Sequence, residues 1–300
     1  MNIRSVKEQY ELRNQCLKER LETILPRVMM ESEADLWLHA SKEYNEDPTF
    51  RALTPAQYPT ARRITMFAFV KDGEDIIRYS LSMPDEHLNA FYTPYWQFGK
   101  ESQMDALKRL LEEVDPKKIA INASADFAFG DGLSMGIYTT WLKELDEKWL
   151  DRMISDDHLA IKLMELRTPT ERKLLPEVVE AAFSVMNAMY TSEVVEPDVT
   201  TTQDLEWFMM QKVKDMGLDY WFEPTMDLQR EGSDDSHITG VIRRGDLLHC
   251  DFGIRYMNLC TDTQRLAYVA KEGEDAIPKD LANGMKVNNR FQDIVRSCMK

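Results

Sequence analysis

The chain has 300 residues, more than one typical domain, and 43% of them are hydrophobic, so two domains with ordinary cores are expected. Its net charge of −15 and the lack of a basic cluster argue against nucleic acid and anionic membranes as partners. The sequence lacks the apolar run of roughly 18 residues that a transmembrane helix needs, and its polar N-terminus is unlike a secretory leader. We therefore expect a cytoplasmic protein, unless a leader has been removed. The four cysteines have no zinc-type spacing and are predicted to be free thiols.

The first half, residues 1–157, predicts an α/β domain. An amphipathic helix is expected within residues 4–25, and Asp72-Gly73 marks a turn between two strands. Strands are predicted at 34–40, 64–70, 76–82 and 118–123, and helices near 107–114 and 137–145. Strands that alternate with helices indicate a mixed or parallel sheet. The polar stretch at 155–158 is the predicted boundary.

The second half, residues 158–300, begins with helices and continues with strands. Thr168-Pro169-Thr170-Glu171 is a capping box with proline at the first helical position, and Pro176 should kink that helix or delay its start. A second helix is expected over 201–216, with Gly217 as its stop. Strands are predicted at 220–226, 246–254 and 258–270, and a helix at 290–299. This order favours an α+β arrangement.

Two aspartates in the strand-rich part are the candidate metal ligands. Asp251 and Asp262 lie eleven residues apart in a stretch that predicts a β-hairpin. If Tyr256 and Met257 form its two-residue turn, the two aspartates face each other directly across the strands. Carboxylates in that position repel each other, and a divalent cation would relieve the repulsion. A solvated hairpin with acidic side chains in water is the alternative, because the turn lacks an Asn-Gly signal that would fix the register.

The residues around these aspartates resemble the first metal-ligand motif of the pita-bread metallopeptidases, which include Xaa-Pro aminopeptidases, prolidases and methionine aminopeptidases. The motif is Gly245-Asp246, then Asp251-Phe252-Gly253, then Asp262. Upstream, Arg167-Thr168-Pro169-Thr170-Glu171 is similar to the phrase that opens the linker helix of the family. Residues 43–48 and 122–134 are similar to phrases of the creatinase-type N-terminal domain in the Xaa-Pro branch.

The resemblance implies a creatinase-like domain over 1–157, followed over 158–300 by the first half of a pita-bread catalytic domain. It implies a Xaa-Pro aminopeptidase-like metallopeptidase that cleaves an N-terminal peptide bond with a hydroxide bridging two divalent ions. Asp251 and Asp262 would ligate those ions. Manganese is favoured by oxygen-rich ligation, with cobalt or zinc as alternatives. The implied partners are a peptide substrate and, through the N-terminal domain, a second copy of the chain in a homodimer.

Three family ligands, one His and two Glu, have no match. No histidine follows His249, and the only glutamates after Asp262, Glu272 and Glu274, belong to a predicted turn. The interpretation is a C-terminally truncated chain. His237 is a candidate catalytic residue, because family members carry a substrate-orienting His upstream of the first Asp; a surface-loop histidine is the alternative. His249 is interpreted as a polar neighbour of Asp251. The competing functional hypothesis is a metal-free pita-bread protein that acts as a binding or assembly module or as a non-peptidase hydrolase.

Overall fold

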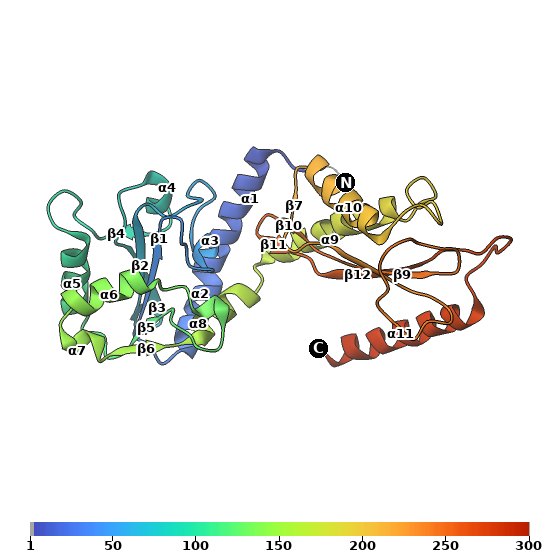
Figure 1. The fold of residues 1–300 in the computed structure, drawn as a ribbon. Coiled ribbons are helices and arrows are strands. Elements are labelled where there is room, and N and C mark those ends of the chain that lie inside the picture. The colour runs from blue at the N-terminus through green and yellow to red at the C-terminus, as the bar shows by residue number, and fades with distance from the viewer. Residues whose placement is uncertain (1–2, 300) are drawn as a thin grey trace. The chain divides into compact units, whose positions relative to one another are not determined.

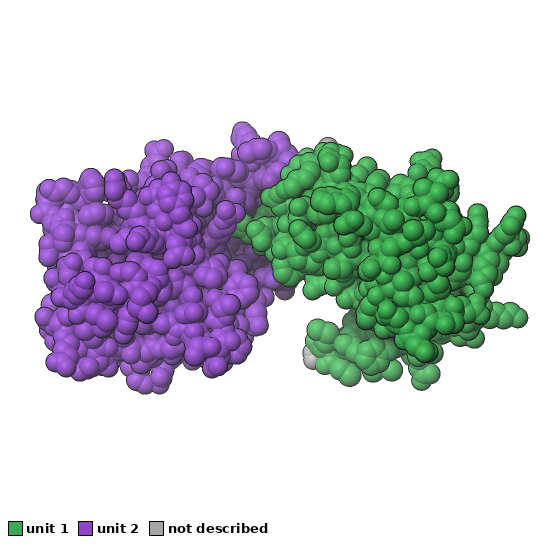
Figure 2. All heavy atoms as spheres, viewed as in Figure 1, with its two compact units in different colours: residues 1–3, 175–300 green, residues 4–174 purple. Residues whose placement is uncertain are grey.

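The computed structural model describes residues 3–299. It contains two compact units, which Figure 2 shows in different colours: an N-terminal unit, Arg4–Leu174, and a C-terminal unit that comprises Ile3 and the chain from Leu175 onward. The division falls inside helix α9 (Pro169–Met189). The boundary between residues 157 and 158 stays a prediction. Among residues 3–299, none of the helices combines the length and apolar composition that crossing a bilayer requires.

The N-terminal unit is built on a six-stranded mixed sheet with the strand order β4-β3-β2-β1-β5-β6 (Figure 1). The strands are β1 (Leu36–Lys42), β2 (Ile64–Asp72), β3 (Asp75–Ser80), β4 (Thr93–Pro94), β5 (Ile119–Ile121) and β6 (Met153–Ser155). The helices are α1 (Val6–Glu19), η1 (Arg20–Ile24), α2 (Leu25–Glu31), α3 (Phe50–Leu53), α4 (Glu86–Asn89), α5 (Gln103–Val114), η2 (Ala128–Gly130), α6 (Met135–Glu144), α7 (Glu147–Leu150) and α8 (Asp157–Glu165). The predicted α/β architecture is confirmed.

Alternation along the two central strands gives this sheet two apolar faces. Trp37 of β1 and Phe67 and Phe69 of β2 point into one core, which also receives α1, η1, α2 and α8. Leu36 and Leu38 point into the other, which receives α5, α6 and α7. Because side chains alternate with a period of two along a strand, a strand covered on both sides is expected to be mostly apolar, and β2 is buried from Thr65 to Val70.

The start of α9 is held to the N-terminal helices by a buried ion pair. Nη2 of Arg20 donates to Oε1 of Glu171 at 2.6 Å, and the two side chains are only 4% and 9% exposed. The predicted capping box is formed: Glu171 N–H donates to Thr168 Oγ1, and Thr168 N–H donates to Glu171 Oε2. Pro176 lies inside α9, which begins at Pro169, so the proline does not delay the helix.

The C-terminal unit carries two small three-stranded sheets, β11-β10-β7 and β12-β9-β8 (Figure 1). Its remaining elements are α10 (Thr202–Asp215), β7 (Asp219–Tyr220), β8 (Thr225–Gln229), β9 (Leu247–Phe252), β10 (Ile254–Tyr256), β11 (Leu259–Cys260), β12 (Thr263–Tyr268) and α11 (Lys279–Cys298). Thr201 caps α10, and Gly217 follows it with φ +71°, so the predicted stop is confirmed.

Candidate metal site

The sheet β12-β9-β8 has one face turned to the helices and one face that carries polar side chains. Cys250 of β9 contacts Met209 of α10, and Arg265 of β12 lies over the ring of Phe183 of α9. On the other face, alternate residues of the three strands form three rows that cross the sheet: Thr225–Asp251–Gln264, Asp227–His249–Leu266 and Gln229–Leu247–Tyr268. Asp251 and His249 are therefore neighbours on this polar face.

The predicted register of the hairpin is wrong, because its two-residue turn lies one residue further along the chain than predicted. The turn consists of Met257 and Asn258, which have φ values of 50° and 64°, so Asp251 pairs with Gln264 and Asp262 falls between the paired segments, across from Gly253. A two-residue turn with both residues at positive φ matches the twist of the strands, and Asn adopts that conformation readily. The two carboxylates are consequently diagonal neighbours, for which Cα atoms are typically about 7–8 Å apart.

Gly253 allows the close approach at this point of the hairpin. A Cβ atom there would lie 2.3 Å from the Thr261 carbonyl oxygen and 2.4 Å from Nε1 of Trp221. That indole N–H donates to the Thr261 carbonyl at 2.6 Å, directly beside Asp262 in the chain. The Gly of the Asp-x-Gly phrase thus has a packing role, since any side chain would push the two strands apart.

The Asp251 carboxylate has an unusual environment. Its Oδ1 atom is buried and finds no hydrogen-bond partner among residues 3–299. Burying a polar atom without a partner typically costs about 1–3 kcal/mol, and more for a charged group. A divalent cation at Oδ1 would remove this cost, so Asp251 fits the role of an oxygen ligand. No group of three or more His, Cys, Asp or Glu in the described part of the chain could hold a metal ion, so Asp251 and Asp262 would be a partial ligand set.

Two histidines converge on Asp227, a residue that sequence reasoning missed. Nδ1 of His249 lies 3.1 Å and Nδ1 of His237 3.4 Å from Oδ2 of Asp227. Nε2 of His249 lies 3.2 Å from Oε1 of Gln264. The available signal was alternation: Thr225, Asp227 and Gln229 are the polar positions of β8.

Electrostatics favour the charged form of His249. Burial alone would lower its pKa, but hydrogen bonds to Asp227 and Gln264 and the charges of Asp227 and Asp251 raise the pKa above its usual value. His237 lies at the surface, with a side chain that is 76% exposed. Burial raises the pKa of Cys250 to about 12, so this residue stays a thiol. All four cysteines are free, as predicted.

The Gly-Asp phrase that precedes β9 is structural. Asp246 is buried, and Arg230 donates to both of its carboxylate oxygens at 2.8 and 2.7 Å. Arg243 N–H also donates to the Asp246 carboxylate. Gly245 has φ +92°, which favours glycine. This bidentate ion pair fixes the entry of the strand that carries Asp251.

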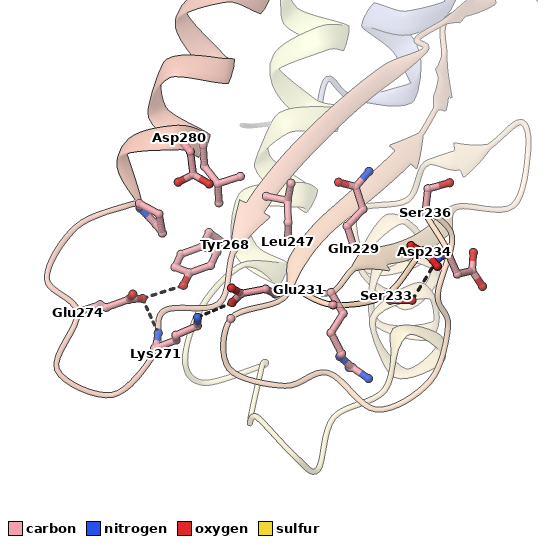
Figure 3. Close-up of a pocket in the computed structure, with 16 residues that line it drawn as sticks. Gln229, Glu231, Ser233, Asp234, Ser236, Leu247, Tyr268, Lys271, Glu274 and Asp280 are labelled. Atoms are coloured by element: carbon pink, nitrogen blue, oxygen red, sulfur yellow. Dashed lines mark hydrogen bonds and ion pairs between the residues drawn. The ribbon is translucent and has the colours of Figure 1, made fainter.

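A pocket of about 670 Å³ lies at the opposite end of the same sheet (Figure 3). Leu247 and Tyr268, partners in one row, contribute to its lining. Lys271 pairs with Glu231 at 2.9 Å, and Glu274 accepts from Tyr268 Oη and the Lys271 N–H. Residues 271–275 form a turn-containing loop, as predicted. Glu274 makes its hydrogen bonds within and beside this loop and lies away from Asp251.

The C-terminal part of the chain matches a protein-family model that covers both aspartates. Residues 173–298 match metallopeptidase family M24. The M24 region begins in α9 and ends at the last residue of α11. The pita-bread resemblance is thereby confirmed.

The M24 match agrees with a curated relative and with solved structures. A Mycoplasma pneumoniae protein named "Putative Xaa-Pro aminopeptidase" is 26% identical over 57% of this chain and 44% of its own length. The chain thus matches less than half the length of that relative. The X-Pro aminopeptidase of Thermotoga maritima (TM-score 0.57, 13% identity) covers 83% of this chain, which spans 66% of that structure. The Xaa-Pro dipeptidase of Bacillus anthracis (TM-score 0.59, 16% identity) covers 89%, and the chain spans 68% of it. These structural matches show the fold.

Proposed function

We propose that the protein is a metal-dependent aminopeptidase or dipeptidase of the Xaa-Pro kind, with Asp251 and Asp262 among its metal ligands. The observation that carries this proposal is the buried Oδ1 of Asp251, which has no hydrogen-bond partner in the described part of the chain and lies within the segment that matches the M24 metallopeptidases. The printed name of the Mycoplasma relative supports a peptide substrate with proline in the second position.

Two divalent cations, when bound, would supply Lewis-acid activation of the scissile carbonyl and of water. The role of this chain is then to hold and orient them. Asp251 would ligate through the oxygen that has no hydrogen-bond partner among residues 3–299, and Asp262 from its diagonal position between β11 and β12. Carboxylate ligands favour manganese among the candidate metals, with cobalt or zinc as alternatives. Two carboxylates leave most coordination positions open, so the proposal includes the His and two Glu that the family resemblance implies.

For the first half of the chain we propose a non-catalytic creatinase-like domain over residues 1–157 that mediates a homodimer. Its sheet is apolar on both faces. Buried polar residues at and after the end of β1 hydrogen-bond to one another, except that Nδ1 of His39 has no hydrogen-bond partner among residues 3–299. Asp47, for example, accepts hydrogen bonds from Thr49 and Asn122. Size-exclusion chromatography with light scattering measures the stoichiometry, and a monomer at micromolar concentration would contradict this part.

The ligand assignment is tested in the full-length protein with Asp251→Asn and Asp262→Asn. Each should abolish stoichiometric manganese binding and reduce turnover of an Xaa-Pro peptide by at least about 100-fold, because a neutral amide is a poor ligand where an anion is required. Asp215→Asn, an exposed substitution at the end of α10, is the matched control and should retain both properties. Wild-type protein with neither bound metal nor peptidase activity would instead favour the metal-free binding module.

A further inference from the structure

A chain of side-chain contacts links all three strands of the polar sheet face. It begins at Asp227 on β8, whose Oδ2 lies 3.1 Å from Nδ1 of His249 on β9. It continues through Nε2 of His249, 3.2 Å from Oε1 of Gln264 on β12. The side chains of Asp227 and His249 are only 16% and 26% exposed, so water competes weakly for the contact between them, whereas the contact to Gln264 is exposed.

The last member of the chain lies directly across from the candidate metal ligand. Gln264 is the cross-strand partner of Asp251, and such partners have Cβ atoms about 4.5–5.5 Å apart. His249 precedes Asp251 by two residues and therefore shares its face of β9. With Oε1 directed to the imidazole ring, the NH₂ group of Gln264 is the part of the amide that can donate to a carboxylate.

We propose that His249 is a positioning residue that acts on Asp251 through Gln264. Asp227 orients the ring of His249, and the ring orients the amide of Gln264. Gln264 and Asp251 are paired across the strands without a hydrogen bond between their side chains in the described residues. The NH₂ group of Gln264 would donate to the second carboxylate oxygen of Asp251 once a divalent cation occupies Oδ1, which has no partner among residues 3–299. This inference rests on the proposed metal dependence. It deepens that proposal by naming three residues that would set metal affinity without touching the metal.

A purely structural reading is that the three residues tie the strands together. The two readings differ in what they predict for metal binding at unchanged stability. Outer hydrogen-bond partners of metal ligands typically change metal affinity by 10- to 100-fold. A strand tie would change the midpoint of unfolding and leave the affinity of the folded protein unchanged.

The test uses metal-free full-length protein and titrates Mn²⁺ calorimetrically. His249→Phe keeps a ring of similar size and removes both hydrogen bonds, and Gln264→Met keeps the length of the side chain and removes the amide. Each should raise the Mn²⁺ Kd roughly tenfold. The double variant should be no weaker than the worse single variant, because both changes interrupt one chain of contacts. Gln229→Met, on the same sheet face but one row beyond His249, is the control and should retain wild-type affinity.

The outcomes separate this inference from the proposed function. If Asp251→Asn weakens Mn²⁺ binding while His249→Phe and Gln264→Met both leave the Kd within twofold of wild type, the positioning role is overturned and the metal ligand stands. If Asp251→Asn itself leaves the Kd unchanged, the ligand assignment and this inference are overturned together. If His249→Phe fails to fold, Gln264→Met decides alone, because Gln264 is an exposed position of β12.

Discussion

Neutralising Glu171 should destabilise the N-terminal unit more than any surface substitution. Arg20 is almost fully buried and pairs with this carboxylate at 2.6 Å, and its other nitrogen donates to the carbonyl oxygens of Leu163 and Leu166. Glu171→Gln keeps an oxygen for the Thr168 cap but leaves the guanidinium without a counter-charge. Breaking a buried ion pair from one side typically costs about 3–5 kcal/mol. For a unit of this size, that corresponds to a fall in Tm of roughly 6–20 °C.

Urea unfolding followed by fluorescence of the buried tryptophans measures the effect, with Glu165→Gln at an exposed position of α8 as the control. The double variant Arg20→Met with Glu171→Gln should regain most of the lost stability, because it removes the uncompensated charge. A loss below about 1 kcal/mol for Glu171→Gln alone would refute the reasoning, since it would mean that Arg20 needs no carboxylate in its buried position.

Two further substitutions test local features. Gly253→Ala should destabilise the C-terminal unit by about 2–4 kcal/mol, because its Cβ would meet the Thr261 carbonyl at 2.3 Å; a denaturation midpoint equal to wild type would contradict this. Burial alone would raise the pKa of Glu19, but hydrogen bonds from Gln15 and Thr170 lower it to about 2, so its stabilising contribution is present above pH 4.5 and lost as the pH falls toward 2. Glu19→Gln should therefore flatten the dependence of stability on pH in this window, and an unchanged slope between pH 5 and 2 would count against it.

Local sequence signals predicted much of the fold. The capping box at Thr168 and the stop at Gly217 depend on contacts within one helical turn, so the sequence specifies them directly. The central strands β1, β2 and β5 were predictable from apolar runs, because both faces of the sheet are buried there. The short edge strands β4 and β6 were not predicted, because they are exposed or half-buried and carry no apolar run. Helix α11 begins eleven residues before the predicted start, at Lys279, because its first turns contain polar residues and Gly284 that weaken the pattern.

The site was predictable only in part. The two aspartates were identified, but their register depends on which residues take positive φ in the turn, and Met257 carries no strong signal for that conformation. Asp227 was not identified as a site residue from the sequence. Its position beside His249 results from the pairing of β8 with β9, which no short motif encodes. His249 was correctly expected beside Asp251, whereas its two partners required the register of all three strands.

Because Asp251 and Asp262 are diagonal neighbours, the strands can pair without the proposed metal ions. The residue directly across from Asp251 is the uncharged Gln264, so no strong charge repulsion opposes pairing of β9 with β12 in the absence of metal. Under the proposed metal dependence, the apoprotein can therefore reach its native conformation first and acquire ions afterwards. A chelator is then expected to inactivate the proposed site reversibly and to leave the surrounding fold intact.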